Sequence, residues 1–256
     1  MYPWRFFSPF WPPSFLHGVP QALPQQRRCA VVEQTVVKAI AISHQFTDGD
    51  ATRQVLDHVD LEIPYGELVT ITGPSGSGKT TLLTLVGLLD PLQSGQLMLA
   101  GEDCTNLSQH ERTLMRRTHL GFVYQFHNLM EELTARENVA MPLLLGGTSR
   151  KIALANADEL LDLVQLSHRG HAFPSRLSGG ERQRTAICRA IIHRPSLVIA
   201  DEPTGNLDPD LAHEIGLLFQ EIAKEQRLAV LMATHDMRLA DSMDRKLILE
   251  HGRLKS

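Results

Sequence analysis

Apolar and polar residues follow one another along this chain in stretches that alternate between strand and helix patterns. Residues 36–46 alternate with a period of two, and 56–73 contains two further strand-like stretches around loops. A helix is expected over 80–89, and 95–104 reads as a strand followed by a turn. The first part of the chain therefore predicts several strands around one helix.

The middle of the chain is helical in pattern, and the last part alternates again. From Asn128 to about Arg176 the spacing is helical, most clearly over 132–145 and in the amphipathic segment 152–166. Strands that alternate with helices predict a mainly parallel sheet, so we expect an α/β fold. The alternating segments near the end of the chain are 181–194, 196–202, 213–226, 228–235 and 246–254.

The first 35 residues differ in composition from the rest. The opening fifteen residues hold both tryptophans of the chain, Trp4 and Trp11, together with four phenylalanines and four prolines. This composition belongs to no regular element, and its prolines interrupt the apolar run that a secretory signal needs. We therefore expect a flexible leader over 1–35, with aromatic anchoring at a membrane surface as the alternative, and an ordered domain over 36–256.

Charge, cysteine content and hydrophobicity limit the expected partners. The formal net charge of −4 provides no basic excess, so nucleic acid is not an expected partner. Cys29, Cys104 and Cys188 are far apart and predict neither a disulfide framework nor a zinc site, which favours a reducing compartment. No apolar run approaches the roughly 20 residues of a membrane-spanning helix, so we expect any membrane association to need a partner.

The segment GPSGSGKT at 73–80 matches the pattern GxxxxGK[ST] of a phosphate-binding loop, between an apolar strand and a helix. Glycines let the backbone aim successive N–H groups inward, and the helix N-terminus adds a partial positive charge. Lys79 is expected to reach the β- and γ-phosphates, and Thr80 to offer its hydroxyl to Mg²⁺. The predicted nucleotide-binding residues here are Gly73, Pro74, Ser75, Gly76, Ser77, Gly78, Lys79, Thr80 and Thr81.

A second motif, SLVIADE at 196–202, places two carboxylates at the end of an apolar strand. Asp201 is expected to bind Mg²⁺ directly or through water. Glu202 would accept a proton from the water that attacks the γ-phosphate, or orient that water. Because an isolated Asp-Glu pair at a strand end is common, this interpretation depends on the phosphate loop and on the other motifs of the chain.

The segment LSGGERQR at 177–184 provides a second helix start, with two glycines after a serine. One nucleotide does not need two phosphate-facing helix N-termini in one chain. Together with the phosphate loop, IADEPTGNLD at 199–208 and THD around His235, this segment resembles the signature motif of ABC ATPases. The resemblance covers nearly all of the chain from Val36 onward.

The resemblance implies an ABC ATPase fold, with a P-loop core around a mainly parallel sheet, an antiparallel β subdomain and a helical subdomain at about 127–180. It also implies a head-to-tail homodimer in which each ATP lies between the phosphate loop of one subunit and the signature helix of the other. ATP and Mg²⁺ are the implied cofactors. The signature residues that would contact the nucleotide across the dimer are Ser178, Gly179 and Gly180.

Four further positions match the family pattern. Gln125 in GFVYQFHN matches the glutamine that senses Mg²⁺ and the attacking water, and His235 matches the switch histidine at the γ-phosphate. Asp208 belongs to the loop that crosses the dimer interface in this family. Phe46 stands where the family usually has an adenine-stacking tyrosine, and its ring keeps the capacity to stack. The implied catalytic residues are Glu202, His235, Gln125 and Lys79, and the implied metal contacts are Thr80, Gln125 and Asp201.

Within the superfamily, YQFH followed by ENVAMPLL resembles the LolD type, the ATPase of the lipoprotein-releasing system of Gram-negative inner membranes. This implies LolC- and LolE-like integral membrane subunits as partners, which would bind near residues 125–145. It also implies lipoproteins as indirect cargo and a peripheral location on the cytoplasmic face of the inner membrane. ADEPTGNLD is shared with MacB-like and FtsE-like ATPases, so a mechanotransmission ATPase of either kind stays an alternative.

Two other classes of protein compete with this interpretation. Non-transport ABC proteins usually carry tandem cassettes, long insertions or a basic surface, whereas this chain has one cassette and a negative net charge. A P-loop kinase would not need the LSGGE segment. Replacing Glu202 by Gln separates these classes, because an ABC ATPase would then form an ATP-stabilised dimer with almost no turnover.

Overall fold

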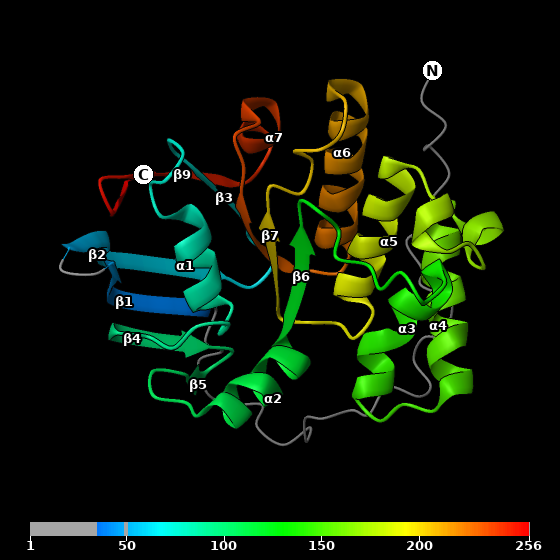
Figure 1. The fold of residues 1–256 in the computed structure, drawn as a ribbon, viewed down its shortest axis with the longest axis horizontal. Coiled ribbons are helices and arrows are strands. Elements are labelled where there is room, and N and C mark those ends of the chain that lie inside the picture. Colours follow the sequence, from blue (N-terminus) through cyan, green and yellow to red (C-terminus); the bar gives the residue numbers. More distant parts are fainter. Residues whose placement is uncertain (1–34, 49–50, 256) are drawn as a thin grey trace.

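A computed structural model describes residues 35–48 and 51–255 of the chain. The predicted leader over 1–35 lies outside the described residues, except for Thr35, with which the first strand begins. That strand thus starts one residue earlier than the pattern of apolar positions predicts. The described part consists of two sheets and the helices that pack on them (Figure 1).

The larger sheet is the mainly parallel sheet that the alternation of strands and helices predicts. Its spatial order is β10-β9-β3-β8-β7-β6, and only the pairing of β10 with β9 is antiparallel. Every residue of β3 and β8 is buried, as in strands covered on both faces. Because parallel strands end at one edge, the motifs that follow them gather there. The strands are β3 (Leu68–Thr72), β6 (Leu120–Tyr124), β7 (Leu197–Asp201), β8 (Ala229–Ala233), β9 (Arg245–Glu250) and β10 (Arg253–Lys255).

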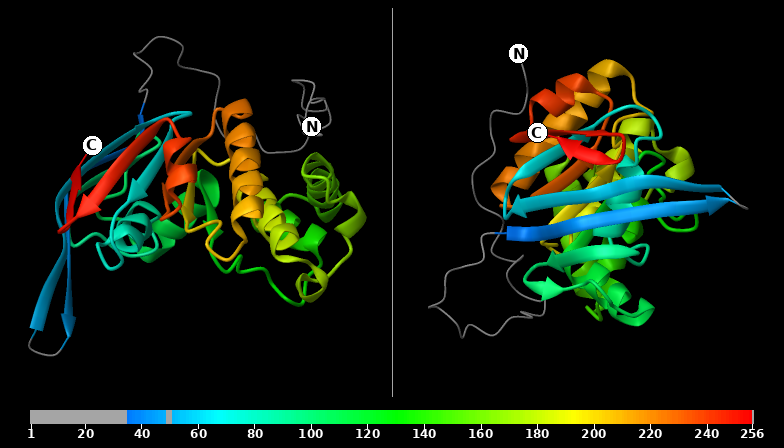
Figure 2. Two further views of the ribbon diagram at one scale, coloured as in Figure 1. Left: turned by 90° about the horizontal axis from the view of Figure 1, so that it is seen from above. Right: turned by 90° about the vertical axis from the view of Figure 1, so that its left-hand side faces the viewer.

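The smaller sheet is antiparallel and has the order β2-β1-β4-β5. β1 and β2 form a long hairpin that projects from the rest of the molecule (Figure 2). Val37, Ile42 and Leu56 of this hairpin are fully buried, and register shifts along β1 interrupt its regular alternation. The strands are β1 (Thr35–Asp48), β2 (Ala51–Pro64), β4 (Ser94–Leu99) and β5 (Glu102–Asp103).

Most helices occupy the segments where helical patterns predict them, with small differences at their ends. Helix α3 begins three residues later than residue 132, where the pattern places its start. The cause is Thr134, whose hydroxyl accepts a hydrogen bond from the Glu137 N–H while the Glu137 carboxylate accepts one from the Thr134 N–H. The helices are α1 (Lys79–Val86), α2 (Gln109–His119), α3 (Ala135–Leu145), α4 (Arg150–Leu163), α5 (Gly179–Ile191), α6 (Pro209–Glu225) and α7 (Met237–Asp241), with 3₁₀ turns at Ser167–Arg169 and Pro174–Arg176.

Among the elements that the pattern along the chain does not predict are β6 and α7. Each has five residues, which leaves little room for a periodicity to show. β6 is defined by its pairing with β7, in which Leu120 lies opposite Leu197 and Tyr124 opposite Asp201. The strand therefore depends on a partner that is distant in the sequence.

Two hydrophobic cores hold the elements together. One core joins the parallel sheet to α3, α4, α5 and α6, with Ile187 and Phe219 among its buried side chains. The other lies between the two sheets and α1, where Ile71 and Leu82 are buried. Helix α1 packs on β2, β7 and β8, whereas α5 packs on α3, α4, α6 and β6. The two helices that begin with glycine-containing motifs therefore pack in different surroundings (Figure 1).

Over residues 35–48 and 51–255, no helix combines the length and the apolar character needed to cross a membrane. The longest helix of this part, α6, has 17 residues and includes Glu214, Glu221 and Lys224.

Candidate functional site

The phosphate loop joins the buried strand β3 to the N-terminus of α1, as its sequence predicts. Gly73, Gly76 and Gly78 have φ angles of 145°, 74° and 104°, a region that residues with side chains rarely adopt. A Cβ on Gly73 would also lie 2.3 Å from the carbonyl oxygen of Leu249. Glycine is therefore required for the tight course of the loop, which directs backbone N–H groups toward the start of α1.

Lys79 is the first residue of α1 and folds back over the loop. Its Nζ donates hydrogen bonds to the carbonyl oxygens of Gly73 at 2.8 Å and of Pro74 at 3.1 Å. The hydroxyl of Ser77 is buried and has no hydrogen-bond partner among the described residues. A cation and an unpaired hydroxyl beside a turn of N–H groups fit a bound chain of phosphates.

Asp201 ends β7 close to the phosphate loop, because α1 packs on β7 and β8. The hydroxyl of Thr80 donates a hydrogen bond to the Asp201 carboxylate. Burial raises the pKa of Asp201 and the neighbouring charge of Glu202 adds to this rise, while the Thr80 hydrogen bond and the charge of Lys79 oppose it. The hydroxyl and the carboxylate together present the oxygen atoms that Mg²⁺ prefers as ligands.

Glu202 and His235 contact each other at the ends of neighbouring strands. Nδ1 of His235 lies 2.7 Å from Oε2 of Glu202, and the His235 N–H donates to the same oxygen at 3.2 Å. The Glu202 side chain is 19% exposed and that of His235 is 70% exposed. Glu202 has a φ of 47°, a left-handed conformation that costs a residue with a side chain about 1–3 kcal/mol. Such strain concentrates at functional sites, which makes the pair a candidate for activating water.

Gln125 follows β6 and is joined to the loop after β7. Its Nε2 donates to Oδ1 of Asn206 at 3.1 Å, and Nδ2 of Asn206 donates to the carbonyl oxygen of Gln125 at 2.9 Å. In the same loop, Oδ1 of Asp208 caps α6 by accepting a hydrogen bond from the Leu211 N–H at 3.1 Å. No motif predicts the link between Gln125 and Asn206, which the pairing of β6 with β7 brings about.

The signature residues lie at the N-terminus of α5. The hydroxyl of Ser178 accepts a hydrogen bond from the Glu181 N–H at 3.3 Å, and Glu181 accepts one from the Ser178 N–H at 2.7 Å. Glu181 also pairs with Arg169 at 2.8 Å. A Cβ on the buried Gly180 would lie 2.9 Å from the Leu211 side chain. Since α5 and α1 pack on different elements, the signature motif and the phosphate loop stand on separate supports within one chain.

Phe46 lies near the end of β1 and is 52% exposed. Its ring packs edge-on against His44, with ring centroids 4.8 Å apart and 70° between the ring planes. On β2 it lies opposite Arg53, whose Nη2 is 3.5 Å from the carbonyl oxygen of Gly76 in the phosphate loop. Sequence motifs miss Arg53, because only the register of the hairpin shows its place.

Two pockets open around these residues. One lies beside the phosphate loop and is lined by residues 53–55 of β2, residues 74–77 of the loop and residues 250–252, from the end of β9 to the turn before β10. The other includes residues 204–205 after β7 and residues 234–238 after β8. Ligands of α/β proteins bind at the carboxyl ends of the strands, where β3, β7 and β8 lead into these two pockets.

Comparison with curated proteins identifies relatives over most of the chain. A family model described as ABC transporter matches residues 56–205. The chain is 47% identical over 224 residues to the lipoprotein-releasing system ATP-binding protein LolD of Shewanella oneidensis, covering 88% of this chain and 97% of the relative. It is 49% identical over 222 residues to the protein of the same name from Pseudomonas syringae pv. tomato, covering 87% and 98% respectively.

Two solved structures of one ATP-binding cassette have the same fold. A dimeric cassette in a post-hydrolysis state, bound to ADP and Pi, matches with a TM-score of 0.79 and 35% identity, over 86% of this chain and 97% of that chain. A dimeric structure of a bacterial ABC transporter cassette matches with the same TM-score of 0.79 and the same coverage. The chain therefore belongs to the ABC transporter family and has the fold of its ATP-binding, ATP-hydrolysing subunit.

Proposed function

We propose that this chain is the ATPase subunit that powers the release of lipoproteins from the inner membrane, through separate membrane subunits similar to LolC and LolE. The observation that carries the proposal is the near full-length similarity, at 45% to 49% identity, to proteins named LolD. The proposed location is the cytoplasmic face of the inner membrane, where the chain would be a peripheral subunit. Its cargo would be contacted only by the membrane subunits.

Hydrolysis of ATP needs a water molecule in line with the γ-phosphate and a group that accepts its proton. We assign the second role to Glu202, because it follows Asp201, whose carboxylate bonds to Thr80 at the start of α1. His235 would hold that carboxylate through the 2.7 Å contact and reach the γ-phosphate with its exposed ring. Lys79 would exchange its bonds to loop carbonyls for bonds to phosphate oxygens. Gln125 would help to orient the water.

Thr80 and Asp201 are the residues that we propose as the Mg²⁺ site, with Gln125 as a further contact. Bound magnesium would supply positive charge that neutralises the phosphate oxygens of ATP. Burial raises the pKa of Asp201, so the protein alone offers this carboxylate too few hydrogen bonds and positive charges to offset its loss of water. A cation beside this carboxylate would favour its ionised form, which supports the assignment.

The proposed working unit is a head-to-tail homodimer. One solved cassette of the same fold is dimeric in two structures, and the signature helix α5 packs on elements other than those that support α1. A second copy would bring Ser178, Gly179 and Gly180 to the nucleotide held by the first. Asp208 would lie at the contact between the two copies.

Membrane subunits are expected to bind around the loop that precedes α3. Exposed apolar side chains occur there: Phe126 is 74% exposed and Met130 is 46% exposed. Exposed apolar residues that gather in one region are typical of protein contact surfaces. Glu137 in this region is an unsuitable probe, because it caps α3 and its charge reversal would disturb that helix. Phe126 is the better position to test.

Reconstitution tests the proposal. The chain would be combined with its membrane subunits in liposomes that carry a lipoprotein, and transfer of the lipoprotein to a periplasmic carrier would be measured. We expect release with ATP, and we expect Glu202→Gln to lower turnover by at least about 100-fold while stabilising an ATP-bound dimer. Phe126→Asp should reduce release but leave ATP hydrolysis by the isolated chain unchanged.

Two outcomes would contradict different parts of the proposal. ATP turnover without lipoprotein release, in the presence of the cognate membrane subunits, would refute the cargo and favour a MacB-like or FtsE-like role. A Glu202→Gln chain that stays monomeric with ATP, even beside its membrane subunits, would refute the dimeric mechanism.

A further inference from the structure

Arg53 lies on β2 at the pocket beside the phosphate loop, and no role described above uses it. Its Nη2 lies 3.5 Å from the carbonyl oxygen of Gly76, and residues 53–55 line the same pocket as residues 74–77. In the β1–β2 hairpin, Arg53 is directly opposite Phe46. Directly opposite residues of an antiparallel pair project from the same face, so the two side chains start from neighbouring positions on one face of the hairpin.

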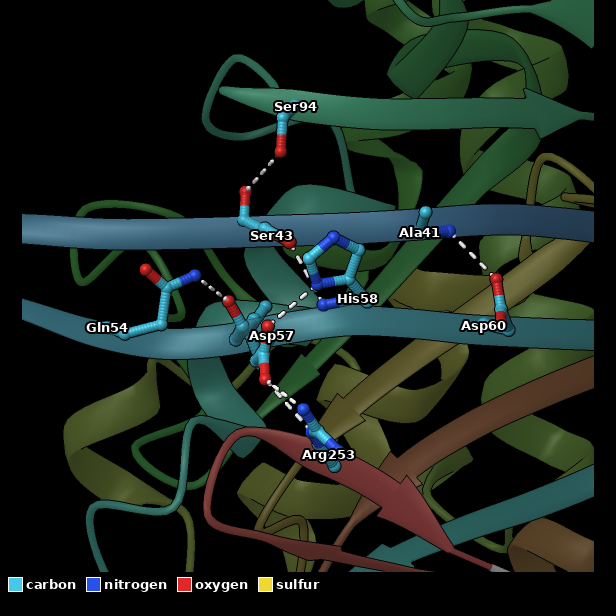
Figure 3. A network of polar contacts seen from close by, with 9 residues as sticks. Ala41, Ser43, Gln54, Asp57, His58, Asp60, Ser94 and Arg253 are labelled. Carbon is cyan, nitrogen blue, oxygen red and sulfur yellow. Dashed lines mark hydrogen bonds and ion pairs between the residues drawn. The ribbon is translucent and has the colours of Figure 1, made fainter.

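The part of β2 that follows Arg53 is fixed to the parallel sheet. Asp57 accepts hydrogen bonds from Nε of Arg253 at 2.9 Å and from its Nη2 at 2.8 Å (Figure 3). The Asp57 N–H also donates to the carbonyl oxygen of Gly252 at 2.8 Å. The hydrogen bond with His58 and the bonds from Arg253 hold the pKa of Asp57 below its ordinary value, so the carboxylate stays charged. The base of the hairpin is thus held at β10, which keeps Arg53 beside the phosphate loop.

Within the part of the chain that the structure describes, no carboxylate pairs with Arg53, unlike two other arginines that contact β2. Arg253 pairs with Asp57 at 2.8 Å, and Arg245 pairs with Glu67 at 2.8 Å. Among the described residues, Arg53 makes one long hydrogen bond, to a carbonyl oxygen of the phosphate loop. A guanidinium has five N–H donors, so most of its bonding capacity is available to an anion.

We propose that Arg53 is a further nucleotide-binding residue whose guanidinium binds the α-phosphate of ATP or ADP. This inference rests on the proposed ATPase function and adds a contact that the sequence motifs do not assign. When adenine stacks on Phe46 and the outer phosphates lie beside Lys79, the ribose and the α-phosphate span the interval between them. Arg53 stands in that interval, opposite Phe46 and against Gly76. Its planar fork of donors suits a phosphate group.

The proposed contact predicts a specific pattern of binding losses. Arg53→Ala should weaken ATP and ADP by the same factor, about 5- to 20-fold, because both nucleotides carry the α-phosphate. Arg53→Lys should weaken the binding of both nucleotides only about threefold, because lysine keeps the charge but lacks the forked geometry. Adenosine lacks phosphate and should bind equally to the unmodified chain and to Arg53→Ala.

Equilibrium binding to the full-length chain tests this pattern, with displacement of a fluorescent ADP analogue as the measurement. ATP, ADP and adenosine would each be titrated against the unmodified chain, Arg53→Ala and Arg53→Lys. Lys38→Ala is the matched control, because Lys38 is an exposed cation on β1 of the same hairpin. Thermal unfolding of each variant checks that the fold is kept, and Arg53→Lys carries the test if Arg53→Ala does not fold.

Each result either supports or overturns the proposal. Equal losses for ATP and ADP, with adenosine and the Lys38→Ala control unaffected, are the expected result. Nucleotide affinity that changes by less than about twofold in Arg53→Ala would overturn it. An equal loss of affinity for adenosine would overturn it and would indicate a role in base stacking. A much larger loss of affinity for ATP than for ADP would also overturn it and would indicate a contact with the γ-phosphate. If the unmodified chain binds no nucleotide, the proposed ATPase function itself fails, which is a separate result.

Discussion

The helices α1 and α5 both begin with glycine-containing motifs, yet their N-termini are satisfied in different ways. Gly78 precedes α1 in a left-handed conformation, no side chain caps the helix, and its first turn has no acidic residue. Ser178 and Glu181 form a reciprocal capping box at α5, and Glu181 places a carboxylate in the first turn. The N–H groups at the start of α1 are therefore open to a ligand, whereas those of α5 are partly used within the chain.

This difference indicates that the two motifs contribute unequally to nucleotide binding. An uncapped N-terminus attracts an anion, and Lys79 adds a full positive charge there. At α5 the Glu181 carboxylate opposes an anion, and its ion pair with Arg169 at 2.8 Å reduces that opposition. We infer that α1 determines the affinity for nucleotide, while α5 determines whether a second subunit joins it through Ser178 and the nearby N–H groups.

The largest effect is expected at α1. Lys79→Ala should weaken ATP and ADP by about 100-fold or more, because it removes the cation at the helix start that would bond to the phosphates. Displacement of a fluorescent ADP analogue measures the loss. Lys151→Ala, an exposed position in α4, is the control and should bind as the unmodified chain does. If the ADP affinity of Lys79→Ala stayed within about threefold of that of the unmodified chain, α1 would not be the dominant nucleotide-binding site and the contrast with α5 would fail.

An intermediate effect is expected at α5. Ser178→Ala should change ADP affinity by less than about twofold and weaken ATP-dependent dimerisation about tenfold. The reason is that the Ser178 hydroxyl would contact the nucleotide of the other subunit. Sedimentation in the Glu202→Gln background measures dimerisation. Loss of the cap should also lower the free energy of unfolding by about 1 kcal/mol.

A matched variant separates the two consequences of Ser178→Ala. Ser108 forms the same capping box with Glu111 at the start of α2, so Ser108→Ala should show a similar loss of stability and normal dimerisation. Unchanged dimerisation in Ser178→Ala would mean that α5 does not supply the contact between subunits.

The smallest effect concerns the acid stability of the α5 cap. Burial acts to raise the pKa of Glu181, but hydrogen bonds from the Ser178 backbone and from Arg169 outweigh it, so the pKa lies below the ordinary 4.5. A depressed carboxyl pKa contributes stability that is present above the unfolded-state pKa and is lost as the pH falls through the folded-state pKa. Urea unfolding of the unmodified chain and of Glu181→Gln should differ by about 1 kcal/mol at pH 7. The difference should shrink below pH 4.5, and a difference that does not change with pH would exclude the charge as its source.

Sequence patterns predicted the elements that carry their own signal and missed those that depend on distant partners. β8 is a continuous apolar run, and β3 is apolar except for Thr70 and Thr72; every residue of both is buried. β6 is equally short, but it contains a glycine and is followed by polar residues, so its own pattern does not mark it as a strand. Its pairing with β7 defines it. The start of α3 was misplaced for a local reason, because the capping box of Thr134 begins the helix later than the apolar spacing indicates.

The candidate site divides in the same way. The phosphate loop occupies one short segment, so its residues and their order could be predicted from the sequence. The bonds between Gln125 and Asn206 join residues 81 positions apart, and only the order of strands in the sheet brings them together. Arg53 belongs to no motif, and its place beside the loop follows from the register of a hairpin.

The reciprocal bonds between Gln125 and Asn206 also determine where this connection can bend. Gln125 is tied to the loop after β7, while the carbonyl oxygens of residues 127–128 both accept hydrogen bonds at 2.6 Å from Arg189 of α5. Along the chain, Phe126 alone separates the two fastened points. Movement of this connection between its two fastened points would therefore fall on the backbone torsions of one exposed residue.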